Sequence, residues 1–131
     1  MTDKAKKILK LIETVDPTDT DTLDEIDALV LSFLEGVKPV GFNKERTMYE
    51  YDWGQGVNWF FASRIPKYTR SRDALKSIRP RGWYLNILNK GSDGCSCSMY
   101  RYDYTPVLTL PTEELAELHA IIQAIQWERT K

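Results

Sequence analysis

Three segments of the chain carry apolar residues every three or four positions, the spacing expected where a helix buries one face. They lie within residues 1–36 and 112–129, which are therefore predicted to form a helical N-terminal segment and a C-terminal helix. The apolar positions are Ala5, Ile8, Leu9, Ile12 and Val15, then Ile26, Leu29, Val30, Phe33 and Leu34, and finally Leu115, Leu118, Ile122 and Ile125.

Polar residues and a glycine mark the ends of two of these helices. Thr22 and Glu25 have the spacing of a capping box at the start of the second helix, and Gly36 ends it. Thr112 is the expected cap of the last helix.

The middle of the chain has the alternating, aromatic pattern of strands, and residues 44–104 are predicted to form a β-rich core. Residues 46–53 and 57–63 flank Gly-Gln-Gly and are expected to pair as a hairpin. A second hairpin is expected to join 83–88 with 95–104.

A short helix over residues 71–79 is predicted between the two hairpins. Ser71 or Thr69 is its expected cap, and Leu75 and Ile78 are expected to face inward.

A chain of 131 residues, 42% of them hydrophobic, suits one domain with one core. We therefore expect residues 1–131 to form a single α+β domain. Its small, mainly antiparallel sheet of about four strands would be covered by the N-terminal and C-terminal helices in a sandwich-like arrangement.

Charge is distributed unevenly although the net charge is only −1. Acidic residues outnumber basic ones in residues 1–36, and basic residues outnumber acidic ones in 37–111. No overall field draws the chain to nucleic acid or to a membrane, so any such attraction must come from a local patch. No apolar run approaches the roughly 20 residues of a membrane helix, and no signal-peptide core is present, so no membrane partner is expected.

The two cysteines point to a reducing compartment. Cys95 and Cys97 are one residue apart in a predicted strand, which places their Cα atoms about 6.8 Å apart. That separation is at the outer limit for a disulfide. Reduced thiols in a cytoplasm are the simpler interpretation.

The most basic stretch of the chain lies between Arg64 and Arg81. Its candidate ligand- or partner-binding residues are five cations flanked by two aromatic rings, namely Arg70, Arg72, Lys76, Arg79 and Arg81 with Tyr68 and Trp83. Guanidinium groups beside rings suit phosphates, stacked bases or an acidic protein. The competing interpretation is the solvated face of an amphipathic helix.

A cluster of aromatic residues offers a second candidate surface. In an alternating strand Trp59 and Phe61 share one face and Phe60 takes the other, so burying all three needs cover on both sides of the sheet. The cover could come from the domain's own core or from another subunit, which leaves a homo-oligomer open.

Residues suited to catalysis or metal binding are few. His119 is the single histidine, and no motif orients it as a general base for a Cys97 nucleophile. The cysteines and the histidine form no closed zinc set, and no phosphate-binding loop is present. We therefore expect a non-enzymatic protein without a cofactor or metal.

Three stretches resemble the phage ABA sandwich domain family of small tailed-phage and prophage proteins. They are "YTRSRDALKSIRPRGWYLNI", "TLDEIDALVLSFLEG" and "TPVLTLPTEELAELHAIIQAI". The sequence departs from the family pattern at Arg72, Lys76, Arg79 and Arg81, where relatives are usually apolar or neutral. The family has no established common activity, so the resemblance implies a fold and an origin in a phage or prophage.

These observations favour a phage-encoded accessory protein in the bacterial cytoplasm that binds a host protein or a small anionic ligand and could counteract host defence. The alternatives are a nucleotide or nucleic-acid binder that uses the basic stretch, and a structural homo-oligomer. Under either binding hypothesis that uses this stretch, an Arg72→Glu, Arg79→Glu double substitution is expected to weaken binding and leave thermal unfolding nearly unchanged.

Overall fold

The computed structural model describes residues 2–91, 94–101, 104–106 and 108–130. In chain order the elements are α1 (Asp3–Thr14), α2 (Thr20–Glu35), β1 (Lys38–Phe42), β2 (Met48–Asp52), β3 (Val57–Phe61), the 3₁₀ turn η1 (Ala62–Arg64), α3 (Arg72–Lys76), β4 (Tyr84–Gly91), β5 (Gly94–Tyr100), β6 (Thr109–Leu110) and α4 (Glu113–Arg129). The predicted α+β class is confirmed.

The strands form two antiparallel sheets of three strands each, with orders β1-β2-β3 and β4-β5-β6. The expectation of one sheet of about four strands is not confirmed. Both predicted hairpins are present, as β2-β3 and β4-β5. Each gains a third strand that the pattern did not predict, since β1 contains Pro39 and Gly41 and β6 is only two residues long.

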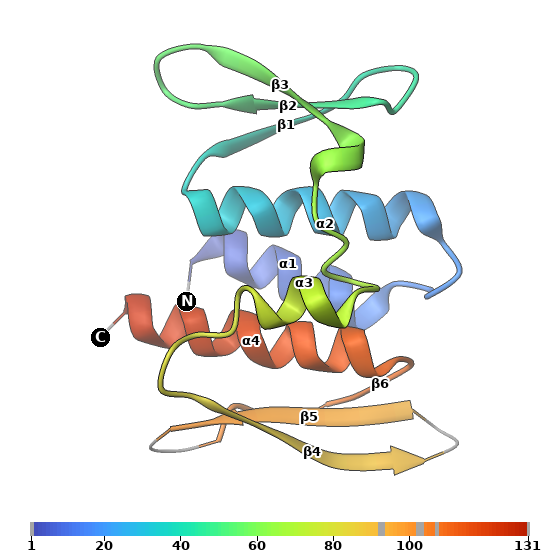
Figure 1. Ribbon diagram of the computed structural model, residues 1–131, viewed down its shortest axis with the longest axis vertical. Helices are drawn as coiled ribbons and strands as arrows, with labels where there is room; N and C mark the ends of the chain where they lie inside the picture. The colour runs from blue at the N-terminus through green and yellow to red at the C-terminus, as the bar shows by residue number, and fades with distance from the viewer. Residues whose placement is uncertain (1, 92–93, 102–103, 107, 131) are drawn as a thin grey trace.

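The helices lie between the two sheets rather than outside a single one (Figure 1). α2 contacts β1, α4 contacts β5, and α1 packs against both α2 and α4. Each sheet therefore turns one face to the helices, so the sandwich-like cover of one sheet by terminal helices is not confirmed.

Two apolar clusters hold these layers together. The larger one joins α1, α2 and α4 to β5 through residues such as Ile8, Leu118 and Met99. The smaller one places Tyr49 and Tyr51 of β2 against α2. The Tyr51 hydroxyl donates a hydrogen bond to the Ala28 carbonyl at 2.9 Å, which satisfies the only polar group of a buried ring.

Capping residues explain where the helices begin and end. α2 starts three residues earlier than the pattern predicted, because Asp19 rather than Thr22 is the cap and accepts the Thr22 N–H. Gly36 ends the helix at φ 71°, as expected. Thr112 caps α4 by accepting the Leu115 N–H, which confirms that prediction.

Residues 62–83, called the crossing segment below, connect the two sheets. Figure 1 shows this segment running from β3 past the helices to β4, with α3 in its middle. Ser71 caps α3 and the helix ends at Lys76, so it is shorter than the predicted 71–79. Leu75 is buried and anchors α3 to the larger cluster.

Two further expectations concern the cysteines and membranes. Cys95 and Cys97 lie in β5 as free thiols. Within the described ranges, no helix combines the length and the apolar character required to cross a membrane.

The start of β5 provides a test of the second sheet. Gly94 has φ 128°, and a Cβ there would lie 2.2 Å from the Leu110 carbonyl oxygen of β6. Gly94→Ala is expected to lower the free energy of unfolding by about 2 kcal/mol more than Gly54→Ala, since overpacking of this kind typically costs roughly 1–3 kcal/mol.

Gly54 is the matched control because its φ is also positive, at 87°, and, apart from its two chain neighbours, no described residue has an atom within 4 Å of the place that an alanine methyl group would take. Equal losses in urea unfolding would contradict the close β5-β6 approach.

Candidate functional site

The crossing segment is tied to α2 through Arg70. Its Nη2 lies 2.7 Å from Asp27 Oδ2 and 2.6 Å from Asp24 Oδ1, and Lys67 Nζ lies 3.0 Å from the same Asp24 oxygen. Asp27 is buried and also accepts the Thr69 N–H at 2.9 Å. Arg70 is therefore the counter-ion of a carboxylate inside the protein.

The pKa directions follow from this arrangement. Burial raises the pKa of Asp27, and the hydrogen bonds from Arg70 and Thr69 offset only part of that effect. Burial alone would also raise the pKa of Asp24, but hydrogen bonds from Arg70 and Lys67 outweigh it and lower that pKa. Burial would lower the pKa of Arg70, yet its bonds to both carboxylates raise it. Arg70 thus stays charged where Asp27 needs a cation.

The same segment is tied to α4 through two more arginines. Arg79 Nη2 lies 2.7 Å from Glu117 Oε1. Arg72 forms an ion pair with Glu113 and lies 3.9 Å from Glu117. Glu117 is fully buried, so these guanidinium groups compensate a carboxylate that has left water.

Among the described residues, the remaining predicted cations are not held by ion pairs of the kind that Arg70, Arg72 and Arg79 form. Lys76 and Arg81 are exposed and form no ion pair with the part of the chain that the structure describes. The Arg64 guanidinium lies 5.9 Å from the Phe61 ring centroid, on the side of the first sheet. The seven basic residues between Arg64 and Arg81 therefore do not form one free cationic surface.

The two predicted aromatic contacts serve packing in this structure. Tyr68 is only 3% exposed, and burial, with the nearby Asp27 and Glu35 charges, raises its pKa to about 12. Trp83 is half-buried, meets Trp127 edge-to-face at 5.6 Å and donates to Glu128 at 2.8 Å. Neither ring is presented as an open stacking platform beside the arginines.

The outer face of the first sheet carries a row of exposed apolar side chains. Val57, Trp59 and Phe61 of β3 are 50%, 49% and 55% exposed, and all three lie on the face turned away from α2. Val40 in the bulge of β1 is exposed as well. The predicted alternation is confirmed, since Phe60 pairs with the buried Tyr49 on the opposite face.

Two carboxylates lie in the middle of this surface. Glu50 is paired with Trp59 and Asp52 with Val57 in the β2-β3 register. Neither forms an ion pair with a residue in the described ranges, although Asp52 accepts the Gly54 N–H at 2.8 Å. Lys38 of β1 is exposed and paired with Asp52, so it lies on this face as well. The term outer face is used below for Lys38, Val40, Met48, Glu50, Asp52, Val57, Trp59 and Phe61.

The two edges of this sheet differ in their protection. β1 carries Pro39, a bulge and the charged Lys38, which are features that discourage another strand from pairing. β3 has neither proline nor a charged residue. The unprotected edge is thus the one that carries the exposed rings.

His119 and Cys97, considered from the sequence as a base and a nucleophile, have different polar neighbours in the structure. His119 Nε2 lies 3.0 Å from Glu13 Oε2 of α1, so its close polar partner is a carboxylate and not Cys97. Burial, with Glu117 and Glu113 nearby, raises the pKa of the Cys97 thiol to about 11. Within the same ranges no three His, Cys, Asp or Glu side chains gather to hold a metal ion.

No protein-family model, curated protein or solved structure matches this chain. Function therefore has to be argued from the surfaces described above.

The ion pairs change the expected outcome of reversing charge in the crossing segment. Arg79→Glu would leave Glu117 buried without its cation and place a like charge beside it, and breaking a buried pair costs about 3–5 kcal/mol. The substitution is therefore expected to lower the urea midpoint strongly, in contrast to the nearly unchanged unfolding expected from the sequence.

Lys76→Glu is the matched control, because Lys76 is exposed on the same segment and lacks a carboxylate partner among the described residues. Its midpoint should move little. Equal, small shifts for both variants would show that Arg79 does not compensate Glu117.

Proposed function

We propose that the protein is a non-enzymatic binding module that docks a protein partner on its outer face. The observation that carries the proposal is the exposed row Val57, Trp59 and Phe61 beside Glu50 and Asp52. The largest contiguous exposed apolar patch on a monomer is often an interaction site. Trp in particular is enriched among residues that dominate binding energy.

The charges on this surface define the chemistry of the partner. Apolar side chains of β3 lie on one side of the β2 carboxylates, Glu50 and Asp52. On the other side β1 presents Val40 and a single cation, Lys38, so the carboxylates are in excess on this surface. A complementary surface would therefore combine apolar residues with lysine or arginine. We infer that the partner presents a basic, apolar segment, in which the cations meet Glu50 and Asp52 while apolar side chains cover Trp59 and Phe61.

A second copy of this chain fits the outer face less well. Face-to-face packing around a two-fold axis that passes near β2 would bring Glu50 and Asp52 of both copies together, with only one Lys38 in each copy to offset them. Like charges in such an interface cost several kcal/mol. The homo-oligomer alternative therefore has less support than a partner of opposite charge.

The nucleotide or nucleic-acid alternative also has less support. It relied on the arginines of the crossing segment, and Arg70, Arg72 and Arg79 are each held by carboxylates of this chain. A phosphate would have to displace those carboxylates. Lys76 and Arg81 alone make a small basic footprint.

The resemblance to the phage ABA sandwich family gives the proposal its biological setting. On that basis we propose that the partner is a host protein in the bacterial cytoplasm, and that occupying it could counteract a host defence system. The outer face suits such a role because covering a partner's surface requires no catalytic group.

Selection from a displayed library of random peptides tests the partner's chemistry even while the partner itself is unidentified. The wild-type protein is expected to enrich peptides that combine apolar residues with Lys or Arg. A Glu50→Lys, Asp52→Lys variant should enrich peptides with Asp or Glu instead, because only the sign of the central charge has changed. Binding of the selected peptides should weaken at least about tenfold in Trp59→Ser.

Tyr84→Ser is the control, since Tyr84 is 72% exposed on the other sheet and its loss should leave peptide affinity unchanged. Enrichment of the same peptides by the wild-type and charge-reversed proteins would contradict the proposal. The proposal would also be contradicted if none of the selected peptides bound Trp59→Ser more weakly than the wild-type protein.

A further inference from the structure

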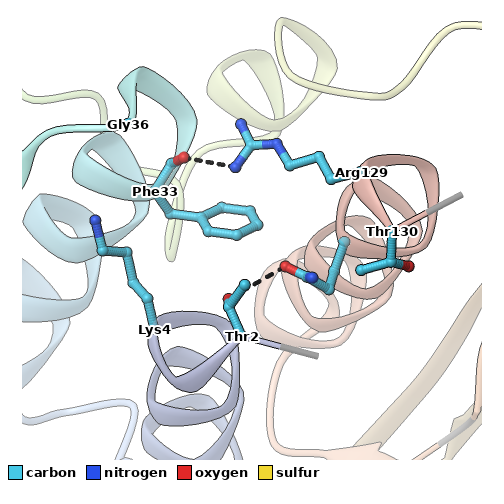
Figure 2. A pocket seen from close by; sticks show the side chains of 7 residues that line it. Thr2, Lys4, Phe33, Gly36, Arg129 and Thr130 are labelled. Carbon is cyan, nitrogen blue, oxygen red and sulfur yellow. Dashed lines mark hydrogen bonds between the residues drawn. The ribbon is translucent and has the colours of Figure 1, made fainter.

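A pocket lies where the start of α1, the end of α2 and the end of α4 meet, on a different part of the molecule from the outer face. Its volume is about 310 Å³, and it is lined by Thr2, Lys4, Phe33, Gly36, Gln126, Arg129 and Thr130. Figure 2 shows the Phe33 ring between Lys4 on one side and Arg129 on the other. The volume is at the lower end for small-molecule sites, so only a small ligand fits.

Two cations line this pocket without a carboxylate partner in the ranges that the structure describes. Lys4 Nζ donates to the Val37 carbonyl at 2.8 Å. Arg129 donates to the carbonyls of Phe33 at 2.8 Å and Leu34 at 3.2 Å. These bonds cap the end of α2 but use only part of the donors, since an ammonium group has three N–H bonds and a guanidinium group has five.

A buried amide in the same pocket has an unused donor. Gln126 is 2% exposed, and its Oε1 accepts from the Thr2 hydroxyl at 3.3 Å. Its Nε2 has no hydrogen-bond partner among the residues that the structure describes. A buried donor left unpaired costs roughly 1–3 kcal/mol, so a ligand oxygen that accepts from it would recover that loss.

We propose that this pocket binds a small organic carboxylate. The carboxylate would accept hydrogen bonds from Gln126 Nε2 and from the remaining N–H groups of Lys4 and Arg129. Its apolar body would occupy the rest of the pocket beside the Arg129 guanidinium, which itself lies 4.4 Å from the Phe33 ring centroid. Gly36 leaves the opening at the end of α2 without a side chain.

The position of the pocket favours a singly charged ligand over phosphate. It lies at the C-terminal ends of α2 and α4, where the helix dipoles present partial negative charge, and beside the N-terminal end of α1, whose dipole presents partial positive charge. Lys4 and Arg129 supply two positive charges, which compensate the partial negative charge and one bound carboxylate. A phosphate dianion would face stronger repulsion from the helix ends.

The electrostatics of Lys4 provide a second readout. Burial, together with the positive charge of Arg129, lowers the pKa of Lys4. A bound carboxylate would offset the repulsion between the two cations, so the Lys4 pKa should rise on binding. A lysine that only caps α2 would show no such change.

Titration with benzoate, monitored by amide NMR shifts and by the pKa of isotopically labelled Lys4, tests the proposal. We expect saturable binding with a Kd of about 1 mM or tighter, and at least about tenfold weaker binding in Lys4→Gln and Arg129→Gln. Gln126→Met should weaken binding without removing a charge. Lys6→Gln is the matched control, since Lys6 is exposed on α1 outside the pocket lining.

Benzyl alcohol and inorganic phosphate are the comparison probes, and both should bind more weakly than benzoate. Benzoate binding that is absent, or unchanged in Lys4→Gln, would overturn the proposal. Tighter binding of phosphate than of benzoate would also overturn it. If Arg129→Gln fails to fold, Lys4→Gln and the Lys4 pKa still decide the outcome.

Discussion

Two carboxylates on the middle helices, Asp27 of α2 and Glu117 of α4, are buried in the fold and need positive charge beside them. The crossing segment provides it, with Arg70 for Asp27 and Arg79, backed by Arg72, for Glu117. These pairs hold one segment against both helices as it passes from the first sheet to the second (Figure 1). Removing one partner of such a pair is costly, so the position of the crossing segment against α2 and α4 depends on these contacts.

Arg70, Arg72 and Arg79 are each paired with carboxylates of the same chain. A guanidinium group already bonded to a buried carboxylate is poorly placed to bind an outside ligand. The outer face of the first sheet lacks such internal partners, because Trp59 and Phe61 extend away from α2 and the adjacent carboxylates are not paired within the described residues. The proposed functional surface is therefore the one whose interactions the fold leaves incomplete.

Local patterns in the sequence were sufficient to predict some features and not others. Helical spacing and the caps Gly36 and Thr112 act over a few residues, so α2 and α4 were predictable, as was the alternation that exposes Trp59. The partners of the arginines were not, because Arg70 and Asp27 are 43 positions apart in the sequence. The two-sheet arrangement was missed because β1 contains Pro39 and Gly41, which conceal a strand. An arginine-rich stretch has the same sequence pattern whether its counter-ions belong to the protein itself or to an outside ligand.

A double-mutant cycle between Asp27 and Arg70 tests most directly whether the crossing segment is held by internal ion pairs. Asp27→Asn and Arg70→Met, alone and together, would be compared by urea unfolding. The free-energy changes should be non-additive, with a coupling of about 1 kcal/mol or more that makes the double variant more stable than the sum of the single losses predicts. Additivity within about 0.5 kcal/mol would contradict the account and return Arg70 to the set of free surface cations.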